Sequence, residues 1–117
     1  MSSIHVFVYG SLKRGFSNHA LLHRAAYLGE HVTAARYTMY DLGPYPAVSI
    51  GGRTPISGEV FAVDKLTLAA LDELEEYPRV YDRIRIATPF GAAWMYVTPA
   101  STHPRVTDGC WRLMDGR

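Results

Sequence analysis

Short apolar runs separated by turns rich in glycine and proline predict that most of the chain forms strands. Residues Ile4–Tyr9 are almost continuously apolar and rich in β-branched and aromatic types, which indicates a buried strand. Residues Tyr81–Thr88 alternate, with Ile84 and Ile86 on one face, which indicates a strand buried on one side. Further strands are predicted over His31–Leu42 and Ala92–Val97, and over Ala47–Ile50 and Ser57–Val63, which a Gly-Gly turn would join as a hairpin.

Two segments have the pattern of helices. Ser17 could cap a helix that runs through Leu28 and stops at Gly29. Asp64 could cap a second helix that runs to about Glu76, with Pro78 just beyond its end. The resulting order of elements favours an α+β fold, a compact and mostly antiparallel β-barrel with flanking α-helices, built as one domain over residues 1–117.

The second helix places one carboxylate on its apolar face. With about 100° per residue, Glu75 lies roughly 40° from Leu71, inside the stripe of apolar positions. Glu76 points about 140° away, where charged side chains normally lie. A carboxylate on a core face is costly unless its proton equilibrium is used, so Glu75 is a candidate catalytic residue. The alternative is that Glu75 lies in a frayed last turn and reaches solvent.

Composition limits the classes of partner. The net charge is +1, which gives no electrostatic reason to expect nucleic acid or an anionic membrane. The single cysteine, Cys110, allows no internal disulfide and fits a reducing compartment. The first apolar run is too short for a signal or a transmembrane segment, so a cytoplasmic location is expected. The protein is expected to be a monomer or a weak homodimer.

Four segments, in this order and spacing, resemble the gamma-glutamylcyclotransferase superfamily over most of the chain. They are the run Val8–Leu12 (VYGSL), the strand Gly58–Phe61 (GEVF), the helix end Leu71–Pro78 (LDELEEYP) and the segment Tyr81–Arg83 (YDR). Trp111 also falls where small bacterial members carry a tryptophan. One position departs from the pattern LDxxEGxP of this family, because Glu76 stands where glycine is usual.

The resemblance implies a fold, a site and a reaction. The backbone N–H groups of the loop formed by Tyr9, Gly10, Ser11 and Leu12 would bind a gamma-glutamyl substrate, and Glu75 would carry protons. Because the loop lacks the asparagine typical of glutathione-pathway enzymes, the chain is more similar to the gamma-glutamylamine type. Weaker candidates for lining the pocket are Tyr45, Tyr81 and Arg83, for which packing or a solvated strand face is the alternative.

The implied reaction is an internal aminolysis that forms 5-oxoproline. Because the nucleophile is the α-amine of the substrate, the protein requires neither a metal nor a cofactor. His19 and His23 have the i, i+4 spacing of metal ligands, but no third ligand is evident in the sequence. Lys13 and Arg14 are expected to be solvated, with contact to a substrate carboxylate as the alternative. The alternative function is a non-catalytic module that binds a metabolite or a peptide end on the same fold.

Overall fold

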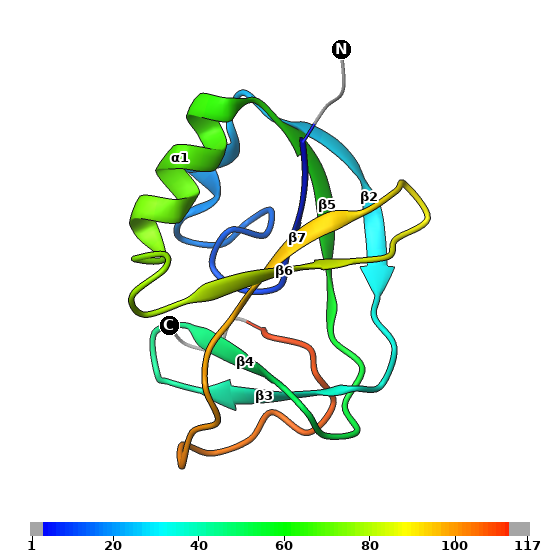
Figure 1. Cartoon of the computed structure of the whole chain (residues 1–117), viewed down its shortest axis with the longest axis vertical. Helices are drawn as coiled ribbons and strands as arrows, with labels where there is room; N and C mark the ends of the chain where they lie inside the picture. The colour runs from blue at the N-terminus through cyan, green and yellow to red at the C-terminus, as the bar shows by residue number, and fades with distance from the viewer. Residues whose placement is uncertain (1–3, 113–117) are drawn as a thin grey trace.

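Two β-sheets and one α-helix make up the part of the chain that the computed structural model describes, residues 4–112. The five-stranded sheet has the order β2-β5-β1-β7-β6 and the two-stranded sheet pairs β3 with β4 (Figure 1). The strands are β1 (Ile4–Val8), β2 (Ala26–Val32), β3 (Tyr37–Asp41), β4 (Pro46–Ile50), β5 (Ser57–Val63), β6 (Asp82–Ile86) and β7 (Ala93–Val97). Helix α1 covers Lys65–Leu74, and η1 (His19–Leu22) is a short 3-10 helix.

The expected α+β class is correct, with two refinements. Only β1 and β7 pair in parallel, and every other strand pair is antiparallel. The two sheets pack against each other without joining into one closed hydrogen-bonded barrel. Among residues 4–112 only one α-helix flanks them, on the left of Figure 1.

Strand β1 lies at the centre of the molecule and is buried on both faces. Phe7 points into a core between the two sheets, together with Met39 and Met95. Val6 and Val8 point into a second core, which Leu71 of α1 closes. This double burial explains why the run Ile4–Tyr9 is almost continuously apolar instead of alternating.

The helix expected from Ser17 to Leu28 is wrong. Only the four residues of η1 are helical, and β2 begins at Ala26. Gly29 is a strand residue beside a shift in the β2–β5 register, and the ring of Phe90 fills the space where a Cβ would lie. Pairing with β5 therefore overrides the local signals for a helix. Gly29 does not end a helix here but allows close packing of the Phe90 ring against the strand.

Two expectations about strand pairing are also wrong. The segment His31–Leu42 is not one strand, because the chain leaves the first sheet after Val32 and enters the second at Tyr37. At this crossing the Thr33 hydroxyl accepts a hydrogen bond of 2.9 Å from the Ile56 N–H. The expected hairpin between β4 and β5 does not form either, since β4 pairs with β3 and β5 pairs with β1 and β2.

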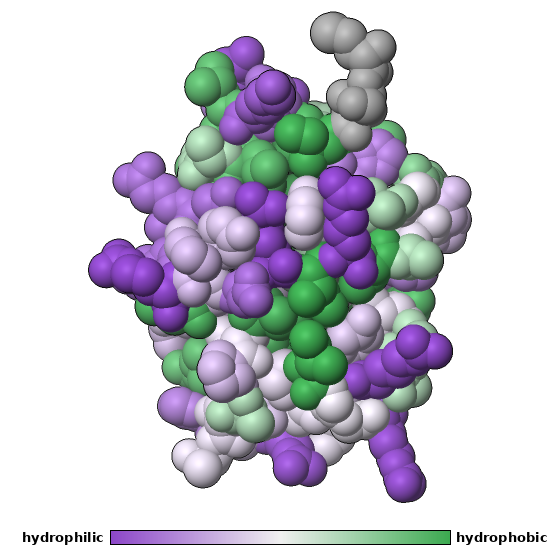
Figure 2. Space-filling model, in the orientation of Figure 1, coloured by the Kyte–Doolittle hydropathy of each residue, from purple (hydrophilic) through white to green (hydrophobic). Residues whose placement is uncertain are grey.

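Polar and charged side chains cover much of the outer surface near the helix. Figure 2 shows hydrophilic side chains gathered over α1 and the β6–β7 hairpin. None of the helices within residues 4–112 has the length and apolar character that crossing a membrane requires.

Candidate functional site

A cavity of about 150 Å³ opens where several segments meet. They are the end of β1 with the loop after it, the start of β4, the end of α1, the segment between α1 and β6, and strand β7. All the site residues expected from the sequence line this cavity except Arg83: they are Tyr9, Gly10, Ser11, Leu12, Tyr45, Glu75 and Tyr81. The structure thus brings the loop and the carboxylate, which are far apart in the sequence, to the same small space.

The loop after β1 supplies hydrogen-bond donors. Within residues 4–112, the N–H groups of Gly10, Ser11 and Leu12 donate to no other protein group. The Ser11 hydroxyl accepts a hydrogen bond of 2.9 Å from the Asn18 side-chain amide, so its own proton remains available as a donor. This row of donors suits an anion or a developing oxyanion.

Contacts with neighbouring segments fix the shape of this loop. The Lys13 N–H donates to the Gly10 carbonyl at 3.0 Å, and the Asn18 N–H donates to the Ser11 carbonyl at 2.8 Å. His19 Nδ1 donates to the Leu12 carbonyl at 2.9 Å, which gives His19 a partner within the protein. A Cβ on Gly10 would lie 2.7 Å from the Pro46 ring, so glycine is required for this close approach.

The expectation that Lys13 is solvated is wrong. Its side chain is buried, and Nζ donates to the Trp111 carbonyl at 2.7 Å while lying 4.7 Å from the centre of the Phe16 ring. Burial lowers the pKa of this ammonium group. The contact ties the C-terminal segment to the loop, which is a structural role for Lys13.

Glu75 follows directly on the last residue of α1. The helix begins at the expected cap, where Asp64 Oδ1 accepts a hydrogen bond of 2.7 Å from the Thr67 N–H. The Glu75 N–H still donates to the Leu71 carbonyl at 3.0 Å, which keeps the helical direction of the side chain. The carboxyl group is largely buried, and burial raises its pKa from 4.5 to about 7, with no charged or hydrogen-bonding partner contributing.

The adjacent Glu76 has a different environment. Its φ angle is 53°, in the left-handed region that glycine favours, which explains why glycine is usual at this position in the family pattern. Although Glu76 also borders the cavity, its side chain is exposed and pairs weakly with Arg79 at 3.7 Å. The change in backbone direction at this residue separates the two glutamates.

Three buried tyrosines stand around Glu75, and each donates its hydroxyl proton to another acceptor. Tyr9 donates to the Tyr96 carbonyl at 2.8 Å, and Tyr81 donates to the Pro46 carbonyl at 3.3 Å. The Tyr96 hydroxyl donates to Asp72 Oδ1 at 2.7 Å. Burial raises the pKa of all three hydroxyls, so they are neutral, and their single protons are engaged within the protein.

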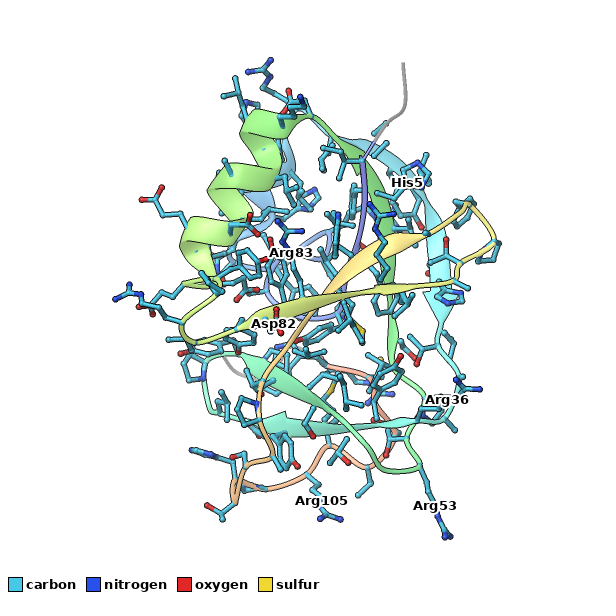
Figure 3. The ribbon with its side chains drawn as sticks, in the orientation of Figure 1. His5, Arg36, Arg53, Asp82, Arg83 and Arg105 are labelled. Carbon is cyan, nitrogen blue, oxygen red and sulfur yellow. The ribbon has the colours of Figure 1, made fainter. Side chains whose placement is uncertain are left out.

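Arg83 does not line the cavity, so the structure does not support the expectation that it contacts substrate. It lies between α1 and the β6–β7 hairpin (Figure 3), where Nε and Nη2 donate to the two oxygens of Asp72 at 3.0 and 3.2 Å. Its guanidinium also stacks on the rings of Tyr77 and Trp94, at 4.4 and 4.3 Å from their centres. The Arg83 guanidinium is therefore bound by other protein groups and does not line the cavity.

Tyr96 and Asn18 are among the lining residues that the sequence does not indicate. Tyr96 lies in the predicted strand Ala92–Val97, whose sequence pattern does not show that it reaches the cavity. Asn18 lies in the segment where the sequence predicts a helix, so its contact with Ser11 is not expected. Among residues 4–112, His, Cys, Asp and Glu side chains form no group of three or more that could hold a metal ion.

Known proteins resemble the chain over nearly its whole length. The family described as "Gamma-glutamyl cyclotransferase, AIG2-like" matches residues 6–113. A Vibrio cholerae protein whose name provisionally calls it a gamma-glutamylcyclotransferase is 44% identical over 108 residues, which cover 91% of this chain and 93% of that protein. The Escherichia coli gamma-glutamylcyclotransferase family protein YtfP is 38% identical over 111 residues, which cover 95% and 92% of the two chains.

Solved structures agree with these sequence matches. The solution structure of Escherichia coli ytfP superposes with a TM-score of 0.74 and 38% identity, covering 92% of this chain and 96% of the other. The crystal structure of an uncharacterized Pyrococcus horikoshii protein superposes with a TM-score of 0.81 and 28% identity, covering 92% and 89%. Since the family match spans the strands, the helix and every segment that forms the cavity, the chain belongs to the AIG2-like gamma-glutamylcyclotransferase family.

Proposed function

We propose that this protein is a cyclotransferase that converts a gamma-glutamyl amine into 5-oxoproline and the free amine. The observation that carries the proposal is a largely buried carboxylate without a partner, Glu75, in one cavity with the unpaired N–H groups of Gly10, Ser11 and Leu12. Proton transfer and oxyanion stabilisation are the two functions that an internal aminolysis requires of a protein.

The chemistry uses Glu75 twice. Its carboxylate first takes a proton from the α-ammonium group of the substrate, and the neutral amine attacks the γ-carbonyl carbon. The resulting oxyanion accepts hydrogen bonds from the loop N–H groups. As the C–N bond to the leaving amine breaks, Glu75 returns the proton to that nitrogen. The ring nitrogen, which gained a positive charge on attack, passes its extra proton to the expelled amine, so the products are 5-oxoproline and an ammonium ion and the reaction consumes no other reagent. A pKa of about 7 suits a group that must both accept and donate a proton near neutral pH.

The charge of the cavity favours one class of leaving group. The only charged residues that line it are Glu75 and Glu76, and no lysine or arginine is among the lining residues that the structure describes. A carboxylate on the leaving amine, as in a gamma-glutamyl amino acid, would therefore meet negative charge without a positive partner. The exposed side chains of Tyr45 and Val80 lie where the cavity meets solvent, so the leaving amine extends toward them. We therefore propose gamma-glutamyl amines without this carboxylate as the preferred substrates.

The direct test is release of 5-oxoproline from a matched substrate panel. Purified protein is incubated with gamma-glutamyl alkylamines and with gamma-glutamyl-α-amino acids, and the product is quantified with and without a chelator. We expect turnover of the amines to exceed that of the α-amino acids at least about tenfold in kcat/KM, and to be unchanged by chelation. Binding of these compounds without any 5-oxoproline would instead identify a non-catalytic binding module.

A further inference from the structure

The ion pair between Asp72 and Arg83 lies outside the cavity but contacts Tyr96, a residue that lines it. Asp72 Oδ1 accepts hydrogen bonds from both Arg83 Nε, at 3.0 Å, and the Tyr96 hydroxyl, at 2.7 Å. The side chains of Arg83 and Asp72 are only 14% and 21% exposed. In every other ion pair among residues 4–112, at least one side chain is 48% or more exposed, so the Arg83–Asp72 pair is the best shielded from solvent. Shielding and a two-point contact make the Asp72 carboxylate a rigid acceptor.

The direction of the Tyr96 proton matters because Tyr96 lines the cavity beside Glu75. A phenol has a single proton, so a hydroxyl that donates to Asp72 cannot donate to another group at the same time. Released from Asp72, the same hydroxyl would find the Glu75 carboxylate as a strong acceptor in its surroundings. A hydrogen bond from a phenol to a carboxylate stabilises the ionised form of that carboxylate.

We propose that Asp72 is a positioning residue for Glu75: it holds the proton of the Tyr96 hydroxyl outside the cavity and so prevents this hydroxyl from donating to the Glu75 carboxylate. Arg83 fixes Asp72 through both of its oxygens and thereby completes the arrangement. The assignment stands on hydrogen-bond geometry, while its catalytic meaning rests on the proposed function of Glu75.

The other groups that face Glu75 fit the same arrangement. Tyr9, in the loop after β1, and Tyr81, in the segment before β6, donate their protons to backbone carbonyls. Tyr45 and the loop donors Gly10 to Leu12 line the same cavity without a hydrogen bond to Glu75, and Glu76 is the other charged residue there. With every buried phenol proton committed elsewhere, burial alone acts on the Glu75 carboxyl and keeps its pKa near neutral.

The test is a titration of the Glu75 carboxyl carbon by NMR in four chains: the parent, Asp72→Ala, Tyr96→Phe and the double variant. We expect Asp72→Ala to lower the titration midpoint by about one pH unit or more, because the freed Tyr96 proton turns toward Glu75. Tyr96→Phe should leave the midpoint within about 0.5 unit, and the double variant should recover most of the drop, because no phenol proton is left to donate.

Each contrary outcome overturns the proposal. A midpoint that rises by more than about 0.5 unit in Tyr96→Phe would mean that the hydroxyl already donates to Glu75 in the parent protein. An equal drop in Asp72→Ala and in the double variant would mean that Asp72 acts through charge or structure and not through Tyr96. If circular dichroism shows that Asp72→Ala does not fold, the proposal is judged on Tyr96→Phe, for which the titration midpoint of Glu75 must not rise by more than about 0.5 unit.

The titration also separates this proposal from the proposed function, since it requires no turnover. If the parent chain produces no 5-oxoproline, the cyclotransferase function fails while the titration still tests the role of Asp72. If the parent is active, the acid limb of its kcat/KM profile should move with the midpoint in each variant.

Discussion

Glu75 and Glu76 are adjacent and chemically identical, yet the end of α1 gives them different properties. Glu75 keeps the helical hydrogen bond to Leu71 and stays largely buried, whereas Glu76 adopts a left-handed conformation and is exposed. The helical wheel could predict this difference because it needs only the direction of the side chain relative to Leu71. An apolar face also favours a raised pKa for Glu75, and burial does raise it, to about 7, whereas the wheel could not predict that three buried tyrosines line the same cavity.

The raised pKa of Glu75 predicts how stability changes with pH. The folded pKa, about 7, exceeds the ordinary value of 4.5, so between these values the folded state holds a proton that the unfolded state has lost. Unfolding then releases a proton and becomes easier as pH rises. Relative to Glu75→Gln, the parent should lose about 1–3 kcal/mol of unfolding free energy between pH 4.5 and pH 8. Urea unfolding of both proteins at these two pH values measures the difference between their unfolding free energies. If this difference is the same at pH 4.5 and pH 8, the pKa of Glu75 is not raised in the folded protein.

The left-handed conformation of Glu76 predicts a stabilising substitution. Glu76→Gly should raise the free energy of unfolding by about 0.5–1 kcal/mol, because glycine adopts a positive φ angle without strain. The ion pair with Arg79 is exposed at 3.7 Å, so its loss should cost little. The matched control is Glu73→Gly, an exposed position inside α1, where the same substitution should destabilise by about 1 kcal/mol. In thermal or urea unfolding, Glu76→Gly should stabilise the protein and Glu73→Gly should destabilise it. If both substitutions change the unfolding free energy in the same direction, the argument from the φ angle of Glu76 is wrong.

At the scale of elements, the pattern of apolar residues predicted most strands because β4 and β7 are buried at nearly consecutive positions and β5 is buried largely at alternate ones. Asp64 predicted the start of α1 because its side chain accepts a hydrogen bond from the Thr67 N–H, which depends only on neighbouring residues. The segment from Ser17 to Leu28 failed because its apolar residues and Gly29 fit either a helix or a strand, and pairing with β5 decided between them. The pairing of β4 also failed, since a Gly-Gly turn does not determine which strand lies beside it.

The loop after β1 yields a prediction about close packing. Gly10→Ala would place a Cβ 2.7 Å from the Pro46 ring, so the loop must shift and its N–H groups must move from their positions. We expect a loss of at least about tenfold in kcat/KM, since a misplacement of this kind affects the oxyanion donors. The control is Asp64→Ala, which should destabilise α1 by about 1 kcal/mol through loss of its cap without this loss of activity. Full activity of Gly10→Ala would show that the loop N–H groups are not required.

At the scale of the whole molecule, the site exists only because the topology brings distant segments together. Parallel pairing of β1 with β7 places the loop after β1 near Tyr96, and α1 brings Glu75 to the same cavity. The family resemblance indicated the loop and Glu75 from the sequence, whereas Arg83 was assigned to the wrong place. Its position could not be predicted without the β6–β7 register and the contact with Asp72, which together turn it away from the cavity.

The measurement that tests the central claim most directly compares 5-oxoproline formation by Glu75→Gln and Glu76→Gln on the best substrate of the parent protein. Gln keeps the shape and the hydrogen-bonding capacity of the side chain but cannot carry the proton. We predict that Glu75→Gln lowers kcat by about 10²–10⁴-fold with substrate binding largely unchanged, and that Glu76→Gln stays within about twofold of the parent. An inactive Glu76→Gln beside an active Glu75→Gln, or full activity in both, would contradict the assignment of proton transfer to Glu75.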